Sequence, residues 1–270
     1  MKESGHLPSS DRLGVVTAVL FLMYAMGQLV DLPLQAVTFH LFGTETSFTL
    51  NFAALLSILD AILAALGADW LLRDHPRLNN QRTTQYIIIP ALTAWGLGIT
   101  LNTLRLSSQW WVLFLLGMVM LVMVYIAEYI IVDLSDFRHI PATIGLISVS
   151  FVLFLMLCIA IDSAELRLYL ALPPIVIALF LVSLRTLYLR LNGRWCFAWS
   201  AGIALVIGQL TMGLHYLPVP PMTFGLLLTG TGYALTGLAC GLEEKRHGFG
   251  LWFEPGIMLF VITLLAVIFV

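Results

Sequence analysis

The sequence has few charged residues. Only 10% of its 270 residues are Asp, Glu, Lys or Arg, whereas soluble globular domains carry about 25%. Its 13 basic residues are spread along the chain and balanced by 15 acidic ones. No basic stripe is present of the kind that nucleic acids require, so a nucleic-acid partner is excluded.

Cysteine and histidine are also scarce. Cys158, Cys196 and Cys240 stand far apart in apolar segments, without a CxxC motif or a cysteine–histidine cluster that would indicate zinc or a disulfide framework. The HExxH, GxSxG and P-loop motifs are absent as well. The sequence predicts no cofactor, no metal site and no catalytic residue, and it does not indicate an enzyme.

Apolar sequence is abundant. Hydrophobic residues make up 60% of the chain, and the mean hydropathy is +0.97. Stretches of about 20 apolar residues, the length that crosses a bilayer, occur near residues 13–31, 52–72, 85–104, 110–132, 142–162, 167–189, 195–217, 221–241 and 252–270. The sequence therefore predicts an all-α polytopic membrane protein of about nine transmembrane helices, with residues 1–270 forming a single integral membrane domain.

The distribution of basic residues supports this division, because cytoplasmic loops of membrane proteins are enriched in Lys and Arg. With a cytoplasmic N-terminus, the inner side receives Lys2, Arg12, Arg73, Arg77, Arg82, Arg138, Arg185, Arg190, Arg194, Lys245 and Arg246. Only Arg105 and Arg167 fall outside. The sequence thus predicts a short cytoplasmic tail (1–12), an N-inside and C-outside topology, and a bacterial-type plasma membrane.

One connection has a different pattern from the others. In QAVTFHLFGTETSFTLN (35–51), polar and apolar residues alternate around a Gly-Thr-Glu-Thr centre, which is typical of a β-hairpin. Lacking Lys and Arg, the segment is expected in the first outer loop (32–51). An ordinary loop that happens to alternate is the other interpretation.

Asp60 lies near the centre of the stretch 52–72. On a helical wheel it shares a face with Ser57, Ala64 and Gly67, opposite a face of large aliphatic residues. Small residues let a neighbouring helix approach closely, so we expect Asp60 to face protein. It lies about 12 Å from the outer end of its helix, and no Lys or Arg is predicted at that depth. Two roles remain open: a protonated carboxyl bonded to another helix, or a site that holds a proton or cation during function.

Candidate partners of Asp60 are Gln28, Gln209, Thr229 and Tyr233, which complete a candidate intramembrane polar site. The stretch 221–241 also carries two stripes of small residues, which predict a central helix packed on two sides. One stripe contains Gly225, Thr229, Gly232 and Thr236, and the other contains Gly230, Ala234, Gly237 and Gly241.

Other acidic residues have simpler interpretations. Asp69 is followed by Arg73 at i+4, so the two are expected to pair at the inner interface. Glu128 and Arg185 lie about one turn inside the inner ends of their helices, which suggests an inner ion pair, although each could instead reach the interface separately. Glu254 precedes Pro255, a pattern typical of a helix N-terminus, and is interpreted as a cap.

Two functions are favoured over a third, an enzyme that acts on lipids, for which the interfacial His, Asp and Arg residues form no recognisable set. In the first, the protein is permease-like, with a small-solute or proton- or cation-linked role centred on Asp60. In the second, it is a non-catalytic subunit or assembly factor of a membrane complex. The lipid bilayer is the expected partner in both cases, joined by other membrane proteins in the second.

Overall fold

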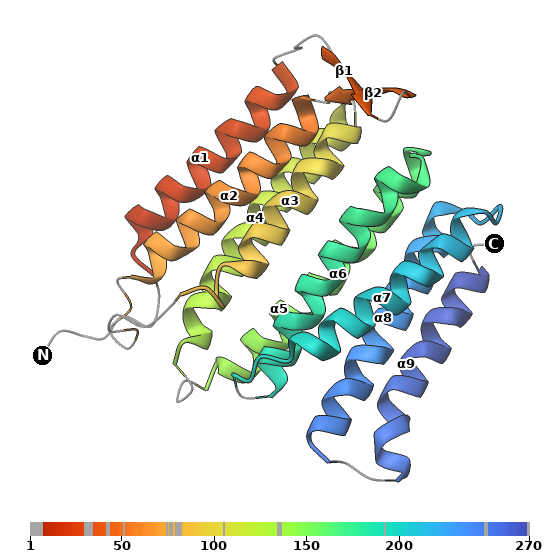
Figure 1. The fold of residues 1–270 in the computed structure, drawn as a ribbon. Helices are drawn as coiled ribbons and strands as arrows, with labels where there is room; N and C mark the ends of the chain where they lie inside the picture. The colour runs from red at the N-terminus through yellow and green to blue at the C-terminus, as the bar shows by residue number, and fades with distance from the viewer. Residues whose placement is uncertain are drawn as a thin grey trace, which may run out of the picture. The chain divides into compact units, whose positions relative to one another are not determined.

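The computed structural model describes residues 8–29, 35–41, 44–50, 52–73, 75, 78, 83–104, 106–133, 137–191, 193–245 and 248–268. Within these residues the chain forms nine helices and one two-stranded sheet (Figure 1). The helices are α1 (Ser10–Leu29), α2 (Phe52–Leu72), α3 (Ile88–Thr103), α4 (Ser108–Ile131), α5 (His139–Ser163), α6 (Leu168–Arg190), α7 (Phe197–His215), α8 (Pro221–Glu243) and α9 (Phe249–Ile268).

The described helices have the length and composition of membrane spans. Seven of them, all except α3 and α9, are long and apolar enough to cross a bilayer, and the shorter apolar segments Ile88–Asn102 and Gly250–Ala266 lie in the other two. The chain is therefore a helical, multi-pass integral membrane protein.

Local sequence explains several helix ends. Before α4, the side chain of Ser107 accepts a hydrogen bond from the backbone N–H of Trp110, as a helix N-cap does. Pro221 occupies the start of α8, where its missing N–H leaves no helical hydrogen bond unmade. Gly193, with φ of +86°, follows the end of α6 and adopts a backbone conformation that favours glycine.

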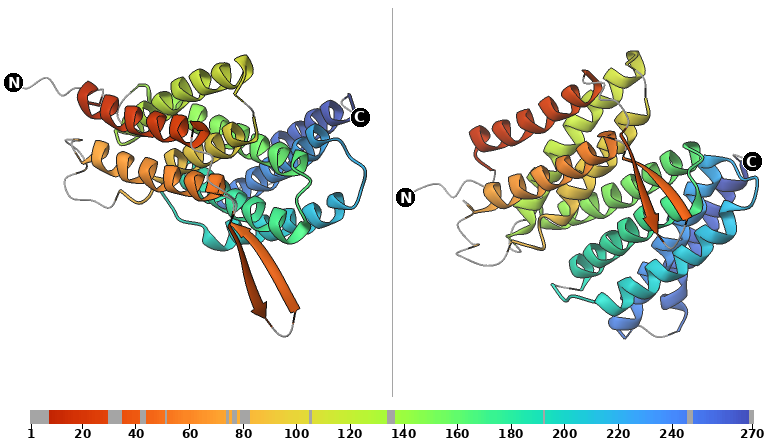
Figure 2. Two further views of the ribbon diagram at one scale, coloured as in Figure 1. Left: turned by 90° about the horizontal axis from the view of Figure 1, so that it is seen from above. Right: turned by 45° about the horizontal axis from the view of Figure 1, so that its top comes forward.

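The chain divides into two compact units, residues 1–139 and 140–270. In the first unit α2 packs against α1 and α3, and α4 packs against the same two helices (Figures 1 and 2). Its core includes Leu20, Ala64, Leu97, Leu121 and Tyr125, each at most 2% exposed.

Between α1 and α2, strands β1 (Gln35–Leu41) and β2 (Thr44–Leu50) pair antiparallel. Gln35 lies opposite Leu50, and Leu41 lies opposite Thr44. The strands occupy the segment in which the sequence alternates, and residues 42–43 between them lie outside the described residues.

In the second unit, α8 lies among α6, α7 and α9. Its small residues permit this close approach. A Cβ added at Gly225 would lie 2.8 Å from Ile159 of α5, and one at Gly232 would lie 3.0 Å from Leu179 of α6.

The second stripe of α8 faces α9. A Cβ added at Gly230 would lie 2.6 Å from Cγ2 of Ile262, and one at Gly241 would lie 2.5 Å from Cδ1 of Leu251. The prediction that two faces of this helix pack closely is confirmed.

Candidate functional site

Asp60 lies on the protein-facing side of α2. It is 2% exposed, and Ser57 and Ala64 on the same face are equally buried. The opposite face is 41–61% exposed at Leu55, Ile58, Leu59, Ile62 and Leu66. The predicted orientation of Asp60 is therefore confirmed.

Two tyrosines lie near Asp60 in the first unit. Tyr24 of α1 interacts electrostatically with Asp60 and with Tyr125 of α4. Their hydroxyl protons are already used, because Tyr24 donates to the carbonyl of Ala94 at 2.9 Å and Tyr125 donates to the carbonyl of Ala64 at 3.0 Å. The Oδ1 atom of Asp60 is buried, and no described residue hydrogen-bonds to it. A buried carboxyl oxygen without a hydrogen bond is costly, so the site has unused capacity to hold a proton or a cation.

The structure places the candidate partners of Asp60 in both units. In the first unit, Gln28 donates to the carbonyl of Leu101 at 2.8 Å, near the end of α3. In the second unit, Gln209 is exposed on α7, while Thr229 and Tyr233 of α8 line a cavity. The grouping of these residues around Asp60 stays a prediction.

The predicted pair of Asp69 and Arg73 is confirmed, with a guanidinium nitrogen 2.6 Å from the carboxylate. The hydroxyl of Thr83 also donates to Asp69, so this carboxylate holds the chain after α2 against its helix. The arginine is 71% exposed at its side chain, which fits a position at the membrane surface.

Glu128 and Arg185 are both buried, at 1% and 0% exposure. Arg185 also lies over the ring of Tyr188, 5.4 Å from its centre. Since the two residues belong to different units, the inner ion pair between them remains a prediction.

Glu254 is not a helix cap, because α9 begins at Phe249 and Pro255 lies inside the helix. Glu254 instead belongs to a cluster with Arg190, the last residue of α6, and Tyr233. The Nη2 atom of Arg190 donates to the Tyr233 hydroxyl at 3.0 Å and to Glu254 at 3.3 Å. The Tyr233 hydroxyl in turn donates to Glu254 at 3.3 Å.

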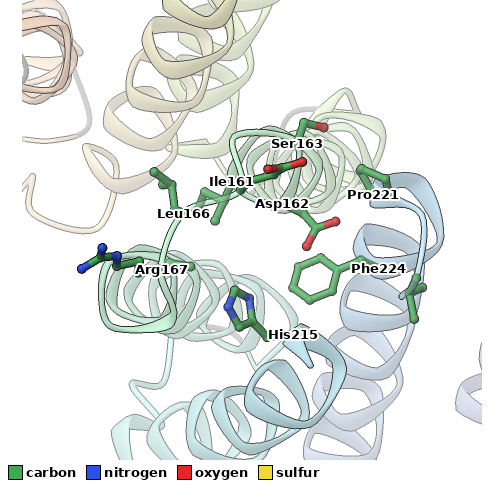
Figure 3. A pocket seen from close by; sticks show the side chains of 11 residues that line it. Ile161, Asp162, Ser163, Leu166, Arg167, His215, Pro221 and Phe224 are labelled. Carbon is green, nitrogen blue, oxygen red and sulfur yellow. The ribbon is translucent and has the colours of Figure 1, made fainter. Parts of the chain in front are cut away.

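A pocket of about 680 Å³ opens where α5 ends, α6 begins, α7 ends and α8 begins. In Figure 3, Asp162 and His215 point toward the same space beside the ring of Phe224, whereas Arg167 points away from it. Asp162 and His215 interact electrostatically, and Glu165 adds a second carboxylate to the lining. The pocket can therefore accept a small polar molecule that bears a positive charge or hydrogen-bond donors.

The sequence did not predict the cluster around Arg190 or the pair of Asp162 and His215. Asp162 and His215 are separated by 53 positions, and Arg190 and Glu254 by 64. The only signal for either pair is that both members lie near helix ends on one predicted side of the membrane. That signal is shared by many residues.

The described residues contain no cluster of three or more His, Cys, Asp or Glu side chains that could hold a metal ion. Cys158, Cys196 and Cys240 are all free thiols. Burial raises the pKa of Cys196, which precedes α7, and Glu243 adds to this effect. Its thiol therefore stays protonated and weakly nucleophilic.

No curated protein and no solved structure matches the chain. One family model, described as "Protein of unknown function (DUF5656)", matches residues 32–269, which include the hairpin and helices α2 to α9. Because this match covers most of the sequence, the chain belongs to the DUF5656 family.

Proposed function

We propose that the protein is permease-like and moves a small solute, a proton or a cation across the membrane, with Asp60 as its ion-binding group. One observation carries this proposal. The Asp60 carboxyl is 2% exposed within a membrane helix, and no described residue hydrogen-bonds to its Oδ1 atom.

A purely structural role for Asp60 would not explain why its Oδ1 atom has no hydrogen bond to the described residues. A carboxyl that holds helices together does so by sharing a hydrogen bond with a neighbouring helix. The hydroxyls of Tyr24 and Tyr125 donate to backbone carbonyls instead. An intramembrane acid costs several kcal/mol when it is ionised and unpaired. Its presence therefore favours a role in binding a proton or cation.

The pocket of the second unit supports the permease-like role, since transport of a solute needs a concave polar site. Asp162 and His215 supply a carboxylate and an imidazole beside an apolar wall that includes Phe224. We propose that this pocket admits a small solute with a basic or hydrogen-bond-donating group.

In the proposed topology, all nine helices cross the membrane and the N-terminus is cytoplasmic. The 11 to 2 distribution of basic residues supports this orientation. The pocket lined by Asp162 and His215 would then open on the outer side.

A second candidate is a subunit of a membrane complex, and α7 favours it. Gln209 is exposed within this span. Gly202 and Gly213 are exposed on the same helix, and an added Cβ at either would meet no atom within 4 Å. Small residues and a polar amide are typical of helix–helix contacts in membranes.

Proteoliposomes test the first candidate. The purified chain would be reconstituted with a pH-sensitive dye inside the vesicles, and gradients of protons, Na⁺ or K⁺ would be imposed. We expect wild type to give an ion-dependent flux that Asp60→Asn abolishes. Asp69→Asn is the matched control, because it makes the same chemical change in the same helix beside Arg73. Equal flux in wild type and Asp60→Asn would contradict the proposal.

A further inference from the structure

A second cavity of the second unit lies between α5, α8 and α9, with a volume of about 360 Å³. Its walls are largely apolar and include Ile144 and Ile147 of α5 and Met258 and Ile262 of α9. Ile144 is 60% exposed, so the rim of the cavity reaches the lipid-facing surface. From Thr143 to Phe151 the cavity follows α5 for about 12 Å. A ligand that enters from the bilayer and is mostly hydrocarbon fits this lining.

The cavity has a cationic end at Arg190, whose side chain is 25% exposed. Among the described residues, the hydrogen bonds of Arg190 go through its Nη2 atom, to Tyr233 and Glu254. Its Nε and Nη1 atoms bond to none of the residues that the structure describes. The ring of Phe151 packs edge-on against Tyr233 with centres 5.2 Å apart, which orients the hydroxyl toward Arg190. Two charged donors therefore remain for an anion.

Thr229 supplies a second polar group deeper in the cavity. It is 8% exposed, and its Oγ1 atom is buried with no hydrogen bond to any described residue. Thr229 and Tyr233 are four residues apart on α8, about one helical turn along the helix axis, and both line the cavity. A ligand with a hydrogen-bond acceptor close to its anionic group would satisfy Thr229.

We propose that this cavity binds an acidic glycerophospholipid. The lipid phosphate accepts hydrogen bonds from Arg190 and, in place of the Glu254 carboxylate, from the hydroxyl of Tyr233. An ester carbonyl accepts one from Thr229, and an acyl chain lies along Ile147 and Ile262. A glycerophospholipid carries its ester carbonyls on the glycerol next to its phosphate, so one molecule can reach both Arg190 and Thr229, which line the same cavity. Basic pockets between transmembrane helices are a known way of recognising anionic head groups.

Glu254 allows a test in which two substitutions should have opposite effects on lipid binding. Its side chain is 49% exposed and holds Arg190 through a single contact of 3.3 Å. A bound phosphate would compete with this carboxylate for the guanidinium. Removing the Glu254 charge should therefore strengthen lipid binding, whereas removing the Arg190 charge should weaken it. If Arg190 and Glu254 formed only a structural pair, the two substitutions would act in the same direction.

Native mass spectrometry of the full chain tests this site. The purified protein would be incubated in detergent with an equimolar mixture of phosphatidylglycerol and phosphatidylcholine, and the ratio of the two bound lipids would be measured. We expect wild type to prefer phosphatidylglycerol, and Arg190→Gln to reduce that preference about tenfold or more, the usual effect of losing hydrogen bonds to a charged group. Glu254→Gln should increase it.

Arg194→Gln is the matched control, since Arg194 forms a similar pair with Glu243 at 3.4 Å but does not line the cavity. It should leave the lipid ratio unchanged. Thr229→Val, which removes the hydroxyl and keeps the shape, should lower retention of both lipids, because both carry ester carbonyls. If Arg190→Gln fails to fold, the gain in Glu254→Gln still tests the proposal.

Three results would overturn the proposal. The first is an equal lipid ratio in Arg190→Gln and Arg194→Gln. The second is a loss of phosphatidylglycerol in Glu254→Gln. The third is thermal protection by inorganic phosphate alone as large as that by phosphatidylglycerol, since the site would then bind free phosphate rather than a lipid. The proposal does not depend on the role of Asp60.

Discussion

The hydroxyl of Tyr125 on α4 donates a hydrogen bond to the backbone carbonyl of Ala64 on α2, 3.0 Å away. Ala64 lies one helical turn after Asp60 on the same buried face. The bond therefore joins two helices beside the carboxyl while leaving its Oδ1 atom without a partner among the described residues.

Tyr125→Phe should lower the free energy of unfolding by about 1 kcal/mol, the net value of one buried hydrogen bond. Thermal unfolding in detergent would measure this loss. The infrared carbonyl band of the Asp60 carboxyl should not move, because the lost bond does not involve it. A shift of that band would mean that Tyr125 donates to Asp60 in the membrane.

Asp60→Ala should cost less than about 1 kcal/mol of stability, because no described residue hydrogen-bonds to the Oδ1 atom and would lose its partner. A carboxyl that joins helices would instead cost about 1–3 kcal/mol when removed. The unfolding midpoints of wild type, Asp60→Ala and Asp60→Asn distinguish the two cases. A small loss in Asp60→Ala would indicate that this carboxyl is retained for function and not for stability.

Gly230→Ala should destabilise the protein by about 1–3 kcal/mol, the usual cost of overpacking. The added Cβ would lie 2.6 Å from Cγ2 and 3.0 Å from Cβ of Ile262, whose branched side chain has little freedom to move. Gly213→Ala on α7 is the control, since its Cβ would meet no atom within 4 Å. That substitution should be neutral or stabilising, because alanine favours a helix more than glycine does. Equal loss of stability in both variants would contradict the packing of α8 against α9.

Membrane-impermeant maleimide labelling tests the proposed orientation. In a background lacking Cys158, Cys196 and Cys240, Ser163→Cys should react in intact cells, because Ser163 is exposed at the predicted outer end of α5. Glu244→Cys, exposed at the predicted inner end of α8, should react only after the membrane is permeabilised. The reverse pattern would place the N-terminus outside.

Features within one helix or one turn were predictable from the sequence. The face on which Asp60 lies, the pair of Asp69 and Arg73, and the two packed faces of α8 all follow from a period of about 3.6 residues. These features depend on neighbours three or four positions apart. The local chain geometry alone is enough to place them.

Contacts between distant segments could not be predicted in this way. Arg190, Tyr233 and Glu254 come from three helices, and helical periodicity carries no information on which helices adjoin. The start of α9 was also misplaced, because Pro255 is typical of a first turn yet lies inside this helix. A Cβ at Gly237 would lie 3.4 Å from Cγ of Pro255. Gly237 therefore leaves room for the proline ring. This contact between two helices could not be predicted from the position of Pro255 in the sequence.

Difference infrared spectroscopy of the Asp60 carboxyl in lipid tests whether this group binds a proton or a cation. Spectra of wild type minus Asp60→Asn isolate the carbonyl band, which would be followed with pH and with added Na⁺ or K⁺. We expect a band that responds to pH or shifts when a cation is added. A band that responds to neither pH nor cations would contradict this role and leave Asp60 as a structural group.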